Sequence, residues 1–172
     1  MSYFPKQNKK AALTAVFILV LSVIVLSLKN VFPSAGIYVS IGSVALLTAS
    51  LFITIRFVIT HYAYEITSDS LIITKTVGQR KQTAASILLK TGKGICQRPK
   101  SAEQKREFSE RFGKTDSRLS FTQNIFCRQY VYVTEFNGRI YEILLECDDE
   151  FAEALNGAVV SARENHDDEF DE

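Results

Sequence analysis

The sequence has few of the residues that usually build a catalytic or metal site. It contains two histidines, three cysteines and no tryptophan among 172 residues. Because Cys96, Cys127 and Cys147 are odd in number and widely spaced, they argue against a disulfide framework and against paired CxxC metal ligands. His61 lies beside the second apolar run and His166 in an acidic tail, and neither is expected to have a catalytic or metal-binding partner. We therefore predict no metal and no cofactor. The thiols are expected to be reduced and cytoplasmic, a reactive thiol with a lowered pKa being the alternative.

Motifs of known chemistry are also missing. No GxSxG elbow, HExxH pair or EF-hand loop occurs. The closest segment to a phosphate-binding loop, TGKG at 91–94, lacks the GxxxxGK[ST] spacing and a following helix, so we interpret it as a turn. The carboxylates within 148–153 are dense enough to suggest a metal site, but acidic residues also favour a helix start through the helix dipole. The chain is accordingly predicted not to be an enzyme.

Charge is absent from two long apolar runs. Residues 11–28 and 37–55 contain no charged side chain, and 57–59 extend the second run beyond Arg56. A helix rising 1.5 Å per residue covers about 27 Å over the first run, close to the roughly 30 Å of a hydrocarbon core. We therefore predict transmembrane helices at about 11–28 and 37–59, with Arg56 reaching the lipid interface. A cleaved signal peptide is the alternative for the first run, which is longer than a secretory apolar region.

Basic residues set the expected orientation of these spans. Three lysines precede the first run, only Lys29 lies between the runs, and basic residues resume at Arg56. By the positive-inside rule both termini are cytoplasmic, and 29–36 is the only outer segment of a multi-pass protein in the cell membrane. Small residues recur through 36–50, which favours close packing against the first span, a homo-oligomer contact being the alternative. With no acidic residue in either span, transport by this chain alone is not expected.

The region after the second span has the alternation of β-strands. Apolar and β-branched residues alternate over 62–77 on both sides of a Ser68-Asp69 turn, which predicts a hairpin, and a third strand is expected at 83–89. The clearest hairpin is 128–146. Its strands flank Asn137-Gly138, the dipeptide that best tolerates the positive φ angles of a type I′ turn.

A short charged helix is expected over 101–112. Ser101 and Gln104 fit a capping box. Phe108 and Phe112 share one face of this helix and are expected to dock on the sheet, the lipid interface being the alternative.

A final helix is expected after the 128–146 hairpin. Asp148 and Asp149 can cap it, and its apolar residues, Leu155 among them, recur at helical spacing, so that it should cover the sheet. Residues 164–172 are mostly acidic and lack periodicity, which predicts a disordered tail.

Two spans followed at once by YEIT at 64–67, a turn, LIIT at 71–74 and Gly78 resemble the bacterial pleckstrin-homology-like (bPH) domain membrane proteins with two N-terminal transmembrane helices. The resemblance implies an α+β fold. In it the transmembrane hairpin, 1–61, precedes a PH-like antiparallel β-sheet or partly open barrel over 62–163, which a C-terminal helix caps and which serves binding and assembly. The charged stretch 91–123 departs from the family pattern, where short strands are more common, and no lipid-binding motif carries over.

The two halves of the cytoplasmic region have opposite charge. Residues 75–118 contain 12 basic and 4 acidic side chains, a net of +8, whereas 119–172 contain 3 basic and 13 acidic ones, a net of −10. One interpretation is mutual neutralisation inside one fold. The other is a basic surface held against anionic headgroups, where each basic residue contributes on the order of 1 kcal/mol. The residues expected to contact the membrane surface in that case are Lys100, Lys105, Arg106 and Arg111.

These observations favour a membrane-anchored cytoplasmic binding or scaffold module. The bilayer is its first partner, and a partner protein or anionic lipid headgroups are the expected ligands. Nucleic acid is disfavoured because the basic stretch has no RNA-binding aromatic motif and the anchor restricts access. The alternative is an accessory subunit of a larger membrane complex, in a transport or envelope system, that is assembled through its transmembrane helices.

Overall fold

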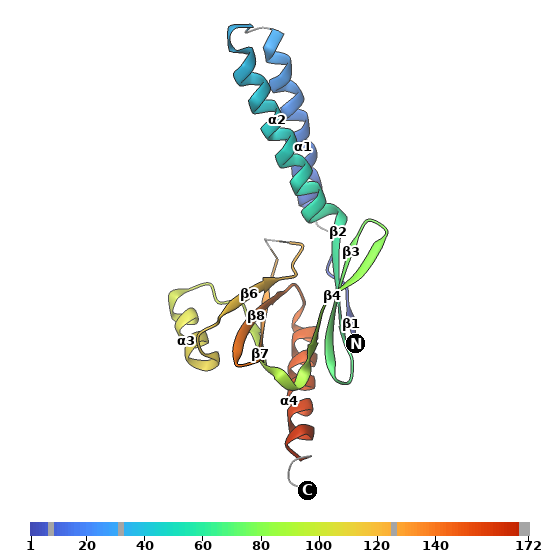
Figure 1. Ribbon diagram of the computed structural model, residues 1–172, viewed down its shortest axis with the longest axis vertical. Coiled ribbons are helices and arrows are strands. Elements are labelled where there is room, and N and C mark those ends of the chain that lie inside the picture. The colour runs from blue at the N-terminus through green and yellow to red at the C-terminus, as the bar shows by residue number, and fades with distance from the viewer. Residues whose placement is uncertain (7–8, 31–32, 125–126, 169–172) are drawn as a thin grey trace. The chain divides into compact units, whose positions relative to one another are not determined.

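The computed structural model describes residues 1–6, 9–30, 33–124 and 127–168, and its fold class is α+β. The chain forms two compact units (Figure 1). The first, called here the helical hairpin, comprises Lys6–His61 and Thr76–Arg80. The second, called the sheet domain, comprises Met1–Pro5, Tyr62–Lys75 and Lys81–Glu172.

The helical hairpin consists of two long apolar helices. Helix α1 spans Lys9–Ser27 and helix α2 spans Gly36–Ile53, with short 3-10 turns at Leu28–Asn30 and Pro33–Ala35 between them. A π-helical turn, η3, Thr54–Ile59, continues α2. Both helices are long and apolar enough to cross a membrane, and only 11% of each apolar window is buried within the protein. Their large apolar side chains therefore face outward.

Small residues bring α1 and α2 together. The buried residues of α2 are Gly36, Ser43 and Ser50, each seven positions from the next, and those of α1 are Ala15 and Ser22 at the same interval. The Ser43 hydroxyl donates to the Ser22 carbonyl at 3.1 Å, and the Ser50 hydroxyl donates to the Ala15 carbonyl at 2.9 Å. Such bonds need closely spaced backbones, which only small side chains permit. The predicted packing against the first span is therefore confirmed.

The sheet domain contains two four-stranded sheets. The first has the order β1-β2-β3-β4 and the second the order β5-β7-β8-β6. The strands of the first sheet are β1 Ser2–Tyr3, β2 Thr60–Ile66, β3 Ser70–Val77 and β4 Arg80–Leu88. Those of the second are β5 Gly92–Gln97, β6 Ser117–Ser120, β7 Tyr130–Phe136 and β8 Arg139–Leu145. A 3-10 turn, η4, Leu89–Thr91, links the two sheets.

Local sequence accounts for the β7–β8 hairpin. Strands β7 and β8 are antiparallel, and Phe136 pairs with Arg139 across the turn. Asn137 and Gly138 between them have φ angles of 52° and 72°. A type I′ turn requires positive φ at both central positions. The prediction of this hairpin from its Asn-Gly dipeptide is confirmed.

The first residues of the chain belong to the sheet domain. The apolar runs predict a transmembrane hairpin over 1–61, but Ser2 pairs with Glu65 and Tyr3 with Tyr64 in the sheet domain. The Tyr3 ring stacks on that of Tyr64 at 6.3 Å and lies 5.5 Å from that of Phe151. The chain thus starts in the sheet domain, forms the helical hairpin and returns. A two-residue strand has no periodicity by which sequence could reveal it.

The buried glutamine Gln123 joins the two points at which the chain leaves and re-enters the sheet domain. Its side-chain oxygen accepts from the Tyr62 N–H at 3.1 Å, and its amide nitrogen donates to the Pro5 carbonyl at 3.3 Å. The Glu146 carboxylate holds this part of the chain, because it accepts from the backbone N–H of Gln123 at 3.1 Å and of Asn124 at 2.8 Å.

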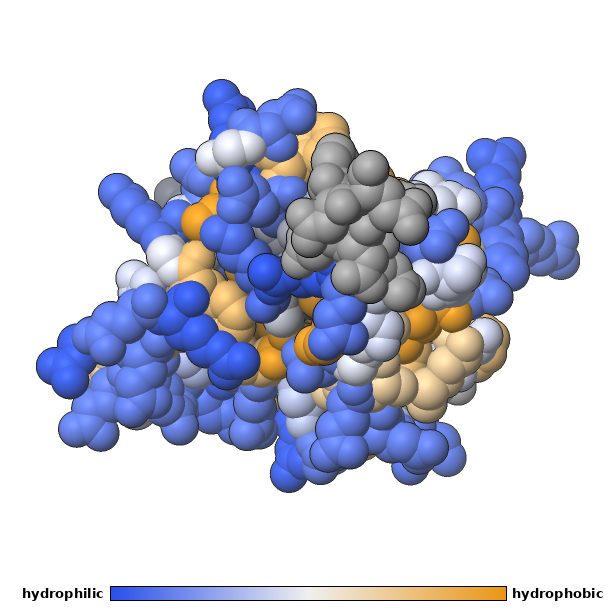
Figure 2. Space-filling view, turned by 90° about the horizontal axis from the view of Figure 1, so that it is seen from below, coloured by the Kyte–Doolittle hydropathy of each residue, from blue (hydrophilic) through white to orange (hydrophobic). Residues whose placement is uncertain are grey.

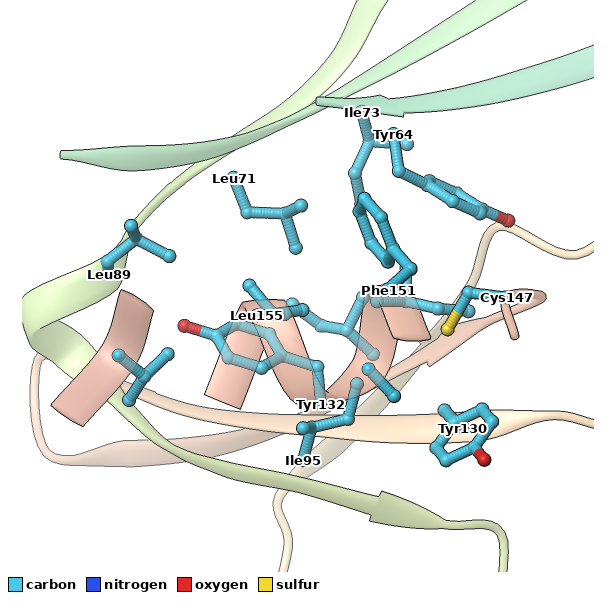
Figure 3. Packing of buried hydrophobic residues seen from close by; sticks show 14 of the residues in the cluster. Tyr64, Leu71, Ile73, Leu89, Ile95, Tyr130, Tyr132, Cys147, Phe151 and Leu155 are labelled. Atoms are coloured by element: carbon cyan, nitrogen blue, oxygen red, sulfur yellow. The ribbon is translucent and has the colours of Figure 1, made fainter. Parts of the chain in front are cut away.

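Helix α4, Asp149–Asp168, packs in the core between the sheets (Figure 3). Asp148 caps it by accepting from the Phe151 N–H at 2.9 Å. Phe151 and Leu155 are fully buried among residues of both sheets, so the prediction that this helix covers the sheet is confirmed. The helix continues through 164–168, where disorder was expected, because no Gly or Pro ends it there. Residues 169–172 lie outside the described residues.

Helix α3, Ala102–Phe112, covers the other face of the second sheet. Its capping box is formed: Ser101 accepts from the Gln104 N–H, and Gln104 accepts from the Ser101 N–H. Phe112 is buried against Val131, Val133 and Leu144, with Phe108 beside it. The predicted docking of this helix is confirmed, and the second sheet is covered on both faces.

Replacing Leu155 by Asp should strongly destabilise the sheet domain. Leu155 is 0% exposed, so the variant buries an unpaired carboxylate, at a cost of roughly 3 kcal/mol or more. Val160 on the same helix is 47% exposed, and Val160→Asp should change stability by less than about 1 kcal/mol. Urea unfolding of full-length protein in detergent, followed by circular dichroism, measures both. Equal stability of the two variants would contradict the packing of α4.

Candidate functional site

A groove of about 720 Å³ lies between α3 and the second sheet. Strand β8 and the chain after α3 form its other boundaries. Five basic residues and one acidic residue are among those that line it. They are Arg98, Lys100, Lys105, Lys114, Arg118 and Glu142. We call it the basic groove.

One wall of the basic groove is set by the start of α3. Lys100 precedes the capping residue Ser101, and its backbone N–H donates to the Gln104 side chain at 2.9 Å. Lys105 follows within the first turns of the helix, and both lysine side chains are exposed. Because Phe108 and Phe112 fix the helix on the sheet, the wall has a defined position.

The opposite wall depends on Gly113, which ends α3. Its φ of 84° lies in the region that favours glycine, and a Cβ there would lie 3.2 Å from the Ile140 side chain. The Gly113 N–H donates to the Ser109 carbonyl at 2.9 Å and closes the last helical turn. The chain after Gly113 continues to β6, which pairs with β8, and Lys114 and Arg118 on it line the groove.

The carboxylate of Glu142 organises this wall. Glu142 lies on β8 and is only 5% exposed. Arg118 donates to one of its oxygens from Nε at 2.6 Å and forms an ion pair with it through a second nitrogen at 2.5 Å. The Thr115 hydroxyl donates to the other oxygen at 2.8 Å. The buried charge is thus compensated, and the charge of Arg118 is largely used in compensating it.

Arg98 is positioned by a neighbouring glutamine. Its guanidinium donates to the Gln129 side-chain oxygen, and its backbone N–H donates to the Gln129 carbonyl at 2.9 Å. These partners are neutral, so the Arg98 charge stays uncompensated within the described part of the chain.

Positive charge therefore exceeds negative charge in the basic groove. Its lining carries five cations and one carboxylate, a formal net of +4. Lys100, Lys105 and Lys114 form no ion pair with any described residue. Like charges gathered around a concave surface raise the local concentration of anions. The arrangement can bind an anion, and a phosphate oxygen suits both the lysines and the Arg98 guanidinium.

The structure brings together two of the four predicted membrane contacts. Lys100 and Lys105 line the basic groove. Arg106 instead pairs with Glu110 on the surface of α3 at 3.4 Å, and the Arg111 guanidinium lies over the Phe112 ring at 4.9 Å.

Sequence reasoning did not single out Arg98, Lys114 and Arg118, although it counted all three in the basic stretch. Long-range folding brings them beside α3, so only their charge could have indicated them from the sequence.

The cysteine in the groove lining is not an activated nucleophile. Burial, and then the charge of Glu146, raise the pKa of the Cys127 thiol to about 12. Burial also raises the pKa of Cys96, and that of Cys147 to about 12. A nucleophilic thiolate requires the opposite shift. None of the three thiols therefore has the lowered pKa that a reactive cysteine needs.

Comparison with known proteins adds no assignment: no protein-family model matches this sequence, and no curated protein matches it.

Alkylation of Cys127 should be slow and should accelerate with pH up to about pH 11. A pKa of about 12 leaves roughly 10⁻⁴ of the thiol ionised at pH 8, and each added pH unit raises that fraction about tenfold. Iodoacetamide kinetics on a variant that keeps only Cys127, read by mass spectrometry, measure the profile. A plateau near pH 8 or 9 would show an ordinary or activated thiol instead.

Proposed function

We propose that this chain is a membrane-anchored cytoplasmic binding module whose basic groove takes the phosphate-bearing headgroups of anionic lipids. The observation that carries the proposal is the groove itself, in which Lys100, Lys105 and Lys114 meet without a compensating carboxylate among the described residues. Anionic headgroups supply the missing charge. The bilayer that would hold α1 and α2 is also where such headgroups are concentrated.

The connection between helix and sheet supports this ligand. The π-helical turn ends at Ile59 and β2 begins at Thr60, with no residue between them. The Thr60 hydroxyl donates to the Ile55 carbonyl at 2.7 Å. A domain tethered so closely to a membrane span meets lipid headgroups at high effective concentration. Weak binding at each cation is then sufficient.

A PH-like organisation of the sheet domain is part of the proposal. Two four-stranded sheets with a C-terminal helix packed between them accord with a partly open barrel used for binding. In this interpretation α3 and the strand β6 are the additions that create the basic groove. The parallel pairing of β6 with β8 is an addition that the antiparallel expectation did not include.

Removing three groove charges should weaken binding to anionic vesicles. A soluble variant joins Pro5 to Tyr62 by Asn-Gly in place of 6–61, because the Gln123 side chain bonds both residues and extending the register of Tyr3 with Tyr64 by two residues would set them opposite each other. Flotation with phosphatidylcholine vesicles that contain phosphatidylglycerol should show binding that rises with anionic lipid and falls with salt. Replacing Lys100, Lys105 and Lys114 by Gln should reduce it at least about tenfold, at roughly 1 kcal/mol for each lysine.

The matched control removes three exposed charges outside the groove: Arg80, Lys81 and Lys90 become Gln. Circular dichroism establishes that each variant is folded. If both triple variants lose vesicle binding equally, the total positive charge of the domain and not the basic groove accounts for the binding. Binding that is independent of salt, or absent on strongly anionic vesicles, would contradict the proposal.

The orientation of the anchor is the second part of this proposal. We place both termini in the cytoplasm, so a cysteine at Ser34 in a cysteine-free chain should react with an impermeant maleimide on intact cells. Cys147 is buried and would stay unlabelled on either side of the membrane. The cytoplasmic position for comparison is therefore Glu103→Cys, which is exposed on α3. It should react only after the cells are permeabilised. Labelling of the Glu103→Cys variant on sealed cells would reverse the topology.

A further inference from the structure

The cations of the basic groove fall into two groups along α3. Arg98, Lys100 and Lys105 lie around the start of the helix, whereas Lys114 and Arg118 follow its end. The helix has 11 residues and is therefore about 16 Å long at 1.5 Å per residue. Positive charge thus enters the groove from both ends of α3.

A single phosphate group matches only one of these two groups well. To contact both, it would have to draw the Lys100 and Lys114 side chains inward from opposite ends of the helix. Side-chain entropy and the repulsion between the two charges both oppose that arrangement. The volume of the groove, about 720 Å³, is also in the range of sites that hold a whole small molecule.

The group at the start of α3 has the larger uncompensated charge. Among the described residues, Arg98 donates to the neutral Gln129, and neither Lys100 nor Lys105 forms an ion pair. Lys105 and Ser109 are four residues apart and share one face of α3, so a hydroxyl continues the lining toward the end of the helix. This end is the stronger of the two for a phosphate.

The group after α3 offers less charge but still has free donors. Lys114 is exposed and forms no ion pair with any described residue. Arg118 contacts Glu142 through two of its three guanidinium nitrogens, which leaves the third for a ligand. A phosphate at this end would meet one full positive charge and additional N–H groups.

Several carboxylates lie near the groove but outside its lining. Glu110 pairs with Arg106 at 3.4 Å, and Glu107 lines a separate, smaller groove together with Arg111. Further carboxylates outside the lining are Glu103, Asp116 and Glu146, of which the last two accept from backbone N–H groups. They lower the charge of the region as a whole, so recognition depends on which cations a ligand reaches.

The headgroup of a lipid is the part that this surface can distinguish. On the face shown in Figure 2, apolar residues form small patches in a mostly hydrophilic surface. The lining of the basic groove is likewise mainly polar. Acyl chains would therefore add little to recognition in the groove, and the number and spacing of the phosphates decide the ligand.

We propose that the basic groove takes one lipid headgroup that carries two phosphate groups, one bound at each end of α3. Arg98, Lys100 and Lys105 hold the first phosphate, and Lys114 with the third nitrogen of Arg118 holds the second. This inference rests on the proposed lipid binding and narrows its ligand to lipids with two phosphates. Two linked phosphates lose translational freedom once and make both contacts, which favours them over two separate lipids.

The test compares cardiolipin, which has two phosphate groups in one headgroup, with phosphatidylglycerol, which has one. Full-length protein in detergent micelles is titrated with each lipid, and native mass spectrometry counts the lipids bound per chain. Cardiolipin should bind at least about fivefold more tightly, because a basic contact contributes roughly that factor. Equal affinities for the two lipids would overturn this inference and leave anionic-lipid binding in place.

Single lysine substitutions separate the two ends of the groove. Lys114→Gln should lower the cardiolipin affinity about fivefold and leave that of the first bound phosphatidylglycerol nearly unchanged, whereas Lys100→Gln should lower both. The matched control, Lys90→Gln, removes an exposed lysine outside the groove and should lower neither. Melting curves verify that each variant is folded. Lipid held only by the helical hairpin binds alike in all variants.

Two outcomes of these substitutions contradict different claims. If Lys114→Gln lowers both affinities by the same factor, the groove does not distinguish two phosphates from one. If neither Lys100→Gln nor Lys105→Gln changes the binding of either lipid, the groove is not a lipid site, and the proposed function fails with this inference.

A soluble diphosphate is the other source of the same chemistry. Glycerol bisphosphate, the centre of the cardiolipin headgroup without its acyl chains, should not displace cardiolipin at equal concentration, because the micelle around the helical hairpin also concentrates the lipid. Displacement at equal concentration would overturn the lipid as the source of the two phosphates.

Discussion

The hydrogen bonds of one buried side-chain amide, that of Gln123, hold together the two chain segments between which the apolar hairpin is inserted. The amide joins the carbonyl of Pro5 to the N–H of Tyr62, the two points between which the whole helical hairpin is inserted. Glu146 holds the backbone of Gln123 from the end of β8. The helical hairpin is thus an insertion in the sheet domain. Strands β1 and β2 on its two sides pair although more than fifty residues separate them. Residues 1–5 are structural parts of the sheet domain.

This pairing gives the helical hairpin two attachments to one sheet. The chain leaves the sheet domain after β1 and returns to it in β2, the strand with which β1 pairs. In our proposal this tether keeps the basic groove at a high effective concentration of lipid headgroups, which is how modest charge interactions produce useful affinity.

The parts of the structure that sequence predicted are those encoded within a few residues. The Asn137-Gly138 turn, the capping box at Ser101 and the helix that follows Asp148 depend on local backbone chemistry, and the apolar spans depend on composition. Strand β1 and the parallel strand β6 are too short for periodicity and exist through distant partners. The basic groove could be predicted only in part. The charge count indicated the basic stretch 75–118, but the turn at Gly113 and the Glu142 carboxylate determine which of its cations line the groove. The sequence expectation that Arg106 and Arg111 contact a membrane stays a prediction, and helical spacing alone does not say which of the α3 cations line the groove.

Strand β6 shows how one short element supplies a wall of the basic groove. Successive side chains of a strand point to opposite faces, so Arg118 lines the basic groove while its neighbour Leu119 faces the other way. Strand β8 repeats the division, with Glu142 at the basic groove and Ile143 in the main core. Because β6 pairs with β8 in parallel and Arg118 lies opposite Glu142, the register of four residues places the arginine on the one carboxylate of the groove lining. The three lysines of the lining then keep their charge for an anion.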